Sequence, residues 1–303
     1  MNKIILTQRT NRHVVKRVDS TVSPATYDNI YFGTYLSYGS TNSALNFPNK
    51  LAFDAVNNIY ICDTNNSRIV KLTYDFSFIS SYSTLSTVGK PFAILSDANN
   101  DLYIVGVKTN TVNVSSIRIQ RLTTSFVSVK VSGDLHITDQ AKDAIFIPKC
   151  ICRSFTADSF YIGGSDFGLF ETTESLTFSN LAIQTISGID TFWPNLYTNV
   201  TFNGIIKHAN GNLYVNNGRL IFKINSSLEY VSDSGIISKT IFALKIGSDS
   251  SSMLIYNVYN EKLVRYDENL NFIEDVYIGS QVKPYDSINV DAYDIVDFYE
   301  IEV

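Results

Sequence analysis

The side chains that could carry chemistry are few in this sequence of 303 residues. The candidate nucleophiles, bases and soft metal ligands are Cys62, Cys150, Cys152, His13, His136 and His208. A structural zinc ion needs four such ligands at close spacing, and the histidines are far apart in the sequence. No Gly-x-Ser-x-Gly, P-loop or His-Glu-x-x-His motif is present. We therefore expect no metal site, and we interpret the cysteines as buried free thiols of a reducing compartment.

Asp63 and Arg68 are the pair of opposite charges that most resembles catalytic machinery. Asp63 ends one predicted strand, and Arg68 begins the next. At these positions an acid and an arginine can tie the turn between the strands to a neighbouring part of the fold through charge-assisted hydrogen bonds. We expect this structural role for the pair and assign no catalytic residue.

The residues around this pair, 47–82, predict four short strands separated by turns. The strands are expected at residues 50–54, 59–62, 68–72 and 76–82, and the turns are rich in Asn, Asp and Ser. The second strand is apolar on both faces, which is typical of a strand covered by sheets on both sides. Because such a four-stranded unit cannot bury two apolar faces alone, it must stack on copies of itself, and radial stacking gives a propeller.

The same stretch resembles an NHL repeat. That repeat consists roughly of Pro, an apolar strand, a turn, Tyr-Val-x-Asp-Thr and then Asn-x-Arg-Ile. The matching positions in this chain are Pro48, Asp54, Tyr60, Asp63, Asn66, Arg68 and Ile69. The resemblance implies a β-propeller in which these residues form a structural repeat motif.

Weaker copies of the unit account for most of the remaining chain. They predict one all-β domain over residues 1–303, a six-bladed β-propeller with four-stranded antiparallel blades. Six blades of about 50 residues each account for the length. The expected blades are residues 1–36 with 284–303, 47–83, 91–131, 145–187, 203–234 and 241–279.

The two ends of the chain are expected to share the first of these blades. Residues 1–20 align with the second and third strands of the repeat, so the blade needs a first strand from elsewhere to avoid an open edge. We expect residues 287–290 to supply it. Residues 295–303 then form one strand more than closure requires, either an overlapping strand or a tail for a partner. A basic segment at residues 1–17 and an acidic one at 286–303 favour this pairing of the ends.

Two connections, residues 130–144 and 188–202, are longer than the others. Long ordered loops on a rigid scaffold often carry function. Trp193 and Tyr197 make the second connection the candidate binding loop, although plain insertions would account for both segments.

Targeting segments and net charge limit the compartments and the partners that we expect for this protein. The N-terminal segment has an apolar run of only three residues before charges, too short for a signal peptide, and no stretch is long and apolar enough to span a membrane. The formal net charge of −5 argues against nucleic acid as a partner. We expect a protein of the cytoplasm, or one assembled there into a virion, with no membrane partner.

These observations favour a non-catalytic interaction or scaffold protein without a cofactor. The expected partner is a protein or a glycan. A structural or partner-binding subunit of a larger assembly, such as a phage tail or virion, suits a composition rich in Asn, Ile, Tyr and Ser. The sequence leaves the oligomeric state open.

Two alternative functions remain open. Pro48-Asn49 resembles the Pro-Asn pair of calcium-dependent propeller hydrolases related to gluconolactonases and strictosidine synthase, which implies a calcium ion held by oxygen ligands in the pore. That family also carries a Glu near its N-terminus, and residues 1–53 contain none. The other alternative is an RNA-binding propeller, because some NHL propellers bind RNA through a basic face with exposed aromatic residues.

Overall fold

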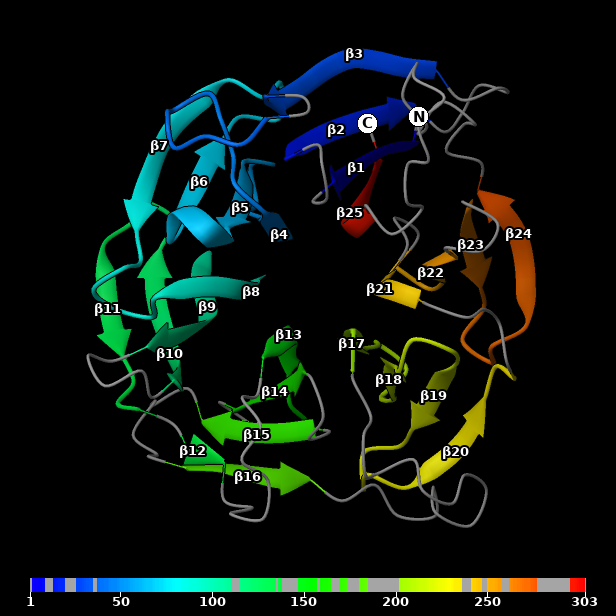
Figure 1. Ribbon diagram of the computed structural model, residues 1–303. Helices are drawn as coiled ribbons and strands as arrows, with labels where there is room; N and C mark the ends of the chain where they lie inside the picture. The colour runs from blue at the N-terminus through cyan, green and yellow to red at the C-terminus, as the bar shows by residue number, and fades with distance from the viewer. Residues whose placement is uncertain are drawn as a thin grey trace.

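Six sheets stand around a common axis in this protein (Figure 1). The structure is a computed structural model, and it describes residues 2–8, 13–19, 26–34, 37–109, 115–134, 136–137, 147–156, 159–164, 169–173, 180–184, 202–235, 241–246, 250–257, 262–276 and 295–302. The expected all-β, six-bladed propeller is confirmed. A single-turn 3-10 helix, η1 (Thr64–Asn66), is the only helical element in these ranges.

The first three blades each contain four antiparallel strands, which follow one another from the axis to the rim. The first blade consists of β25 (Ile295–Glu302), β1 (Asn2–Gln8), β2 (Val14–Asp19) and β3 (Thr26–Gly33). The second consists of β4 (Pro48–Phe53), β5 (Ile59–Asp63), β6 (Arg68–Leu72) and β7 (Phe78–Ser83). The third consists of β8 (Lys90–Ser96), β9 (Asp101–Thr109), β10 (Ser115–Thr123) and β11 (Ser128–Val131).

The other three blades follow the same plan. The fourth consists of β13 (Pro148–Arg153), β14 (Ser159–Gly164), β15 (Leu169–Thr173) and β16 (Asn180–Gln184), with the short strand β12 (His136–Ile137) parallel to β16 at its outer edge. The fifth consists of β17 (Gly204–Lys207), β18 (Leu213–Asn216), β19 (Ile221–Ile224) and β20 (Tyr230–Asp233). The sixth consists of β21 (Ile241–Ile246), β22 (Met253–Asn257), β23 (Lys262–Tyr266) and β24 (Phe272–Val276).

The apolar core lies between neighbouring blades. Residues 59–62 are fully buried, so the prediction that this strand is covered on both faces is confirmed. On one side of it, Tyr60 and Ile69 of the second blade pack with Ile104 and Leu122 of the third. Each such side chain stabilises the fold by about 1.5–3 kcal/mol when it leaves water, and this burial requires the next blade to be in place.

A shared turn geometry allows dissimilar copies of the repeat to form the same blade. In four turns the first side chain accepts hydrogen bonds from the backbone N–H groups two and four positions later, at 2.8 to 3.1 Å; these residues are Asp54, Asp97, Asn225 and Asp267. The fourth residue of each turn has a positive φ, at Asn57, Asn100, Leu228 and Leu270. Leucine has no preference for this conformation, so the hydrogen bonds of the first residue must help to hold the turn.

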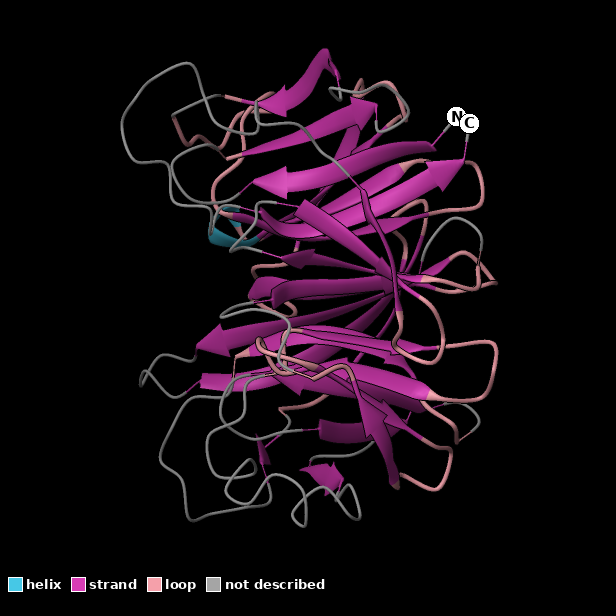
Figure 2. Cartoon of the chain, turned by 90° about the vertical axis from the view of Figure 1, so that its right-hand side faces the viewer, coloured by secondary structure: helices cyan, strands magenta, loops and turns pink. Residues whose placement is uncertain are grey.

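The ring closes through the last strand of the chain. β25 pairs antiparallel with β1, from Asn2 opposite Glu302 to Gln8 opposite Ile295, and the two ends of the chain lie side by side (Figure 2). That both ends share one blade is therefore confirmed. The sequence-based choice of closing strand is wrong, however. Residues 295–302 take the innermost position, whereas residues 287–290 lie outside the described residues.

Asp297 fixes this closing strand to both neighbouring blades. Its side chain is fully buried and accepts a hydrogen bond from the backbone N–H of Leu51 in β4, at 2.8 Å. Its Oδ1 lies 3.6 Å from Nζ of Lys50 in the second blade, and its Oδ2 lies 3.2 Å from Nζ of Lys245 in the sixth. One carboxylate thus joins three blades. Its basic partners come from the flanking blades, whereas the sequence suggested the basic residues at positions 1–17.

Arg68 and Asp63 hold the connection between the first and second blades. The Arg68 guanidinium donates to Asp63 Oδ2 at 2.7 Å and to the backbone oxygens of Ser40, Thr41 and Ala44 at 2.7 to 3.0 Å. Asp63 Oδ1 accepts a hydrogen bond from the backbone N–H of residue 46 at 2.7 Å. These bonds anchor residues 40–46, which have no regular secondary structure, onto the turn after β5.

We expect Arg68→Ala to destabilise the protein by about 3–5 kcal/mol, because it leaves the buried Asp63 carboxylate without its cation. The loss of the three carbonyl partners acts in the same direction. Urea unfolding followed by fluorescence measures the change in unfolding free energy.

The matched control for this change is Arg118→Ala. Arg118 forms an ion pair of the same length with Asp134, 2.7 Å, but that pair is partly exposed. Exposed pairs contribute about 0–1 kcal/mol, so the control variant is expected to lose much less stability. Equal losses in the two variants would contradict the anchoring role of Arg68.

Asp297→Asn tests the closure. The amide preserves the shape of the side chain but removes the charge that compensates Lys50 and Lys245, so we expect a loss of about 3–5 kcal/mol in unfolding free energy. The double variant Asp297→Asn with Lys50→Met removes one of the two cations as well. It should recover part of the loss, measured as a coupling energy in a double-mutant cycle. Strict additivity of the two changes would argue against the ion cluster.

Candidate functional site: a cavity on the propeller axis

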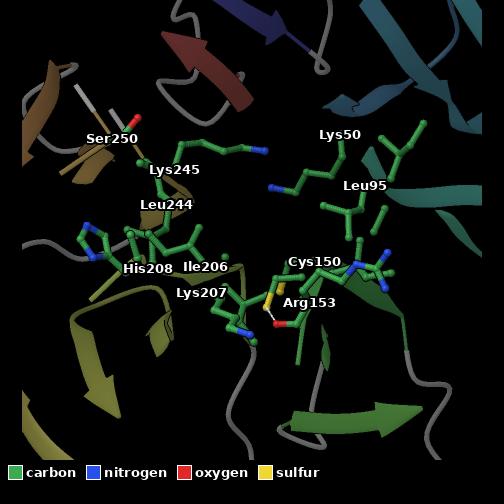
Figure 3. A pocket seen from close by; sticks show the side chains of 18 residues that line it. Lys50, Leu95, Cys150, Arg153, Ile206, Lys207, His208, Leu244, Lys245 and Ser250 are labelled. Atoms are coloured by element: carbon green, nitrogen blue, oxygen red, sulfur yellow. Dashed lines mark hydrogen bonds between the residues drawn. The ribbon is translucent and has the colours of Figure 1, made fainter. Parts of the chain in front are cut away.

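A cavity of about 590 Å³ lies among the innermost strands of the propeller. Residues of β4, β8, β13, β17 and β21 line it, together with residues just after β17 and β21 (Figure 3). Each of these strands is the first strand of a different blade. The cavity is therefore built by five blades, and its lining comes from segments that are far apart in the sequence.

Most of the lining is apolar. Ile151, Ile206 and Leu244 are buried in the walls, and Leu95 and Ile246 are partly buried there. Small-molecule sites are typically cavities of about 300–1,000 Å³ with apolar walls and a few polar groups. The cavity fits this description in both size and lining.

Among the residues described, every charged side chain that lines the cavity is basic. These side chains are Lys50, Arg153, Lys207 and Lys245, and the described lining contains no carboxylate. The whole chain has a formal net charge of −5, so the basic lining does not follow from the overall composition. A concave surface with charges of one sign attracts ligands of the opposite sign.

Lys50 is buried and Lys245 is partly buried, and their ammonium groups are directed toward one another (Figure 3). We call the part of the cavity around these two groups its buried end. Asp297, which does not itself line the cavity, faces both of them. The Lys50 side chain also reaches across the axis to the backbone oxygen of Asn203, at 3.4 Å. Burial lowers the pKa of Lys50, the Asp297 carboxylate acts to raise it, and the charge of Lys245 lowers it further.

Arg153 and Lys207 lie toward the exposed end, and the side chain of each contacts the preceding blade. Arg153 donates to Asp97 Oδ2 at 2.7 Å and lies over the ring of Phe160. Lys207 donates to the backbone oxygen of Ser154 at 2.8 Å. These contacts hold the two cations against the wall.

The thiols of the cavity are poorly suited to nucleophilic chemistry. Cys62, Cys150 and Cys152 are buried and free, as predicted, and the last two line the cavity. Burial raises the pKa of Cys150 to about 12 and that of Cys152 well above its ordinary value. Because the thiolate is the reactive form, these cysteines stay protonated and inert at neutral pH.

His208 is the histidine among the described lining residues, and both its ring nitrogens face backbone groups. Nδ1 accepts a hydrogen bond from the backbone N–H of Asn210 at 3.1 Å, and Nε2 lies 3.0 Å from the backbone oxygen of Ser251. The residue as a whole is 4% exposed. These bonds fix the imidazole as part of the turn after β17, which leaves it poorly placed to take a proton from a ligand.

The residues of the cavity do not fit a calcium ion. Calcium takes six to eight oxygen ligands, several of them carboxylates, whereas the described lining carries lysines and an arginine. Asp297, the carboxylate next to the cavity, faces two ammonium groups. Over the described ranges, no group of three or more His, Cys, Asp or Glu side chains is arranged to hold a metal ion.

The residues of the predicted repeat motif lie in and around the turns of the second blade, away from the cavity lining. Asp54 accepts hydrogen bonds from the Asn58 amide at 2.8 Å and from the Tyr60 hydroxyl at 2.9 Å. Burial acts to raise the pKa of Asp54, but these hydrogen bonds outweigh it and lower the pKa. Asn66 donates to Asp63 Oδ2 at 2.8 Å, and Pro48 begins β4.

The candidate site residues predicted from the sequence did not include Lys50, Arg153, Lys207 and Lys245. A basic residue within or at the end of a largely apolar first strand is the signal that could have pointed to them. The candidate binding loop with Trp193 and Tyr197 lies outside the residues described.

No helix in the described part of the chain is long and apolar enough to cross a membrane.

Comparisons with solved structures find the same fold at low sequence identity. A protein of unknown function from Bacteroides caccae superimposes with a TM-score of 0.68 and 10% identity, over 100% of this chain and 99% of that chain. A streptogramin B lyase matches with a TM-score of 0.57 and 15% identity, over 90% and 78% of the two chains. A catalytically inactive virginiamycin B lyase from Staphylococcus aureus with quinupristin gives 0.57 and 16%, over 93% and 82%.

At the sequence level, comparison with curated proteins finds no match. The NHL repeat family matches residues 45–72, the stretch that contains the predicted motif. Together with the six blades around one axis, this match to one blade supports an NHL-like β-propeller.

Proposed function

We propose that this propeller is a non-catalytic binding protein that takes a ligand, or a group of a larger partner such as a protein or glycan, into its axial cavity. The observation that supports this proposal is the cavity itself. It has apolar walls, basic groups at both ends and a volume of about 590 Å³, which are the features of a ligand site.

Catalysis is the main competing proposal, because two of the structural neighbours are lyases by name. At 15–16% identity those neighbours indicate a shared fold alone. In this chain the thiols of the cavity have raised pKa values, and the nitrogens of His208 face backbone groups. A calcium-dependent hydrolase is disfavoured by the basic lining. RNA binding is disfavoured by the formal net charge of −5.

Binding in the cavity can be tested with three probes of equal chain length: octanol, octanoate and octylamine. In protein labelled at the Ile and Leu methyl groups, we expect at least one probe to shift the NMR signals of Leu95, Ile151, Ile206 and Leu244. The Ile206→Trp variant fills the cavity and should abolish the shifts, whereas Val231→Trp at an exposed site should leave them unchanged.

Two outcomes would contradict this function. One is that none of the probes shifts the cavity methyl signals, or that Ile206→Trp leaves the shifts unchanged although the variant is folded. The other is that the purified protein consumes quinupristin, as measured by chromatography. That result would favour a lyase.

We propose in addition that the protein works as a scaffold subunit of a larger assembly, such as a phage tail or virion. The support is the composition of the chain and the exposure of Phe272 and Ile273 on the outermost strand β24, at 61% and 48%. Side chains of this kind favour contact with another protein when they cluster.

Sedimentation of material from the native source tests this setting. We expect the protein to travel with particles far heavier than the 33.9 kDa of a single chain. Recovery of the protein only at the position of a free monomer would argue against a structural role.

A further inference from the structure

We propose that the ligand of the axial cavity is an amphipathic anion, whose acidic head lies between Lys50 and Lys245 and whose apolar body lies along the cavity walls. This inference rests on the proposed binding function and names the chemical class of its ligand. A carboxylate with an aliphatic or aromatic body is the simplest member of that class.

The distribution of charge at the buried end favours an anionic ligand. Lys50 and Lys245 approach the same point from opposite sides of the cavity (Figure 3). Each faces a different oxygen of Asp297, so two ammonium groups share the influence of one buried carboxylate. The charge of Lys245 also acts against the protonated form of Lys50. A second negative group at this point would reduce the repulsion between the two cations.

The polarity of the lining changes along the cavity. Lys50 is 7% exposed at one end, and the residues Lys207 and Ala209 are exposed at the other. Apolar side chains from four blades line the space between them, namely Ile94, Leu95, Ile151, Ile206, Leu244 and Ile246. A small inorganic anion would leave these walls in contact with water. An anion with an apolar body would cover them.

The acidic head of the ligand is best placed at the buried end. The basic groups nearer the mouth are held against the wall by short hydrogen bonds. Arg153 donates to Asp97 at 2.7 Å, and Lys207 donates to the backbone oxygen of Ser154 at 2.8 Å. Lys50 makes longer contacts, at 3.4 Å to the backbone oxygen of Asn203 across the axis and at 3.6 Å to Asp297 of the neighbouring first blade. Hydrogen bonds between charged groups are stronger in a dry site than in water, so an acidic head gains most at the buried end.

The test compares octanoate with octanol and octylamine by calorimetric titration at low salt. We expect octanoate to bind at least about tenfold more tightly than octanol, the size of one additional charge-assisted contact. Octylamine should bind more weakly than both, because its head carries the same sign of charge as the lysines.

Variants then assign the effect to the lysines. Lys245→Met should weaken octanoate about tenfold and leave octanol within about twofold, whereas Lys245→Arg keeps the charge and should retain most of the affinity. Lys50→Met should behave like Lys245→Met, and the Lys245 variants decide the question if Lys50→Met does not fold. The matched control is Lys130→Met, which removes an exposed charge from β11 and should not change the affinity for octanoate.

The possible results separate this inference from the proposed function. If octanol and octanoate bind in the cavity with equal affinity, or if Lys245→Met does not weaken octanoate, the anion proposal is wrong and the binding function stands. If none of the three probes binds, both proposals fail. Tighter binding of octanoate that disappears in Lys245→Met and returns in Lys245→Arg supports the assignment.

Discussion

The fold depends on how a single carboxylate is satisfied at the centre of the ring. Asp297 is fully buried, and removing a charge from water costs several kcal/mol unless it is compensated. The compensation comes from Lys50, Lys245 and the backbone N–H of Leu51, which belong to the two blades on either side. The closing strand can therefore reach its stable position only when the second and sixth blades are both in place, so closure and stacking become one cooperative event.

The same interaction prepares the cavity. In a propeller the first strand of every blade faces the axis, so each blade contributes side chains to one shared space. Closure through Asp297 brings the ammonium groups of Lys50 and Lys245 together at the buried end of that space, although 194 positions separate the two residues in the sequence. The same ion cluster therefore stabilises the ring and provides the charges of the cavity. Its charges take their positions only in the complete ring.

Much of the architecture was readable from local pattern. One repeat at residues 47–82 carries strong turn signals and a doubly apolar strand, and these predict stacked four-stranded blades. The later copies were harder to recognise, because Leu228 and Leu270 occupy left-handed turn positions that Asn57 and Asn100 occupy earlier. There the first residue of the turn preserves the geometry through its side-chain hydrogen bonds. The closing strand was misassigned because two nearby segments both had the composition of a strand.

The sequence alone determined the fold class, the number of blades, the sharing of one blade by both ends and the burial of the three cysteines. These follow from hydrophobic period, turn chemistry and residue type, which act over a few neighbouring residues. The tertiary structure alone decided which segment closes the ring, which lysines meet Asp297 and where the cavity lies. These features depend on contacts between residues from different blades. Residues so far apart in the sequence can bury one another or form an ion pair only after the ring has brought their strands together.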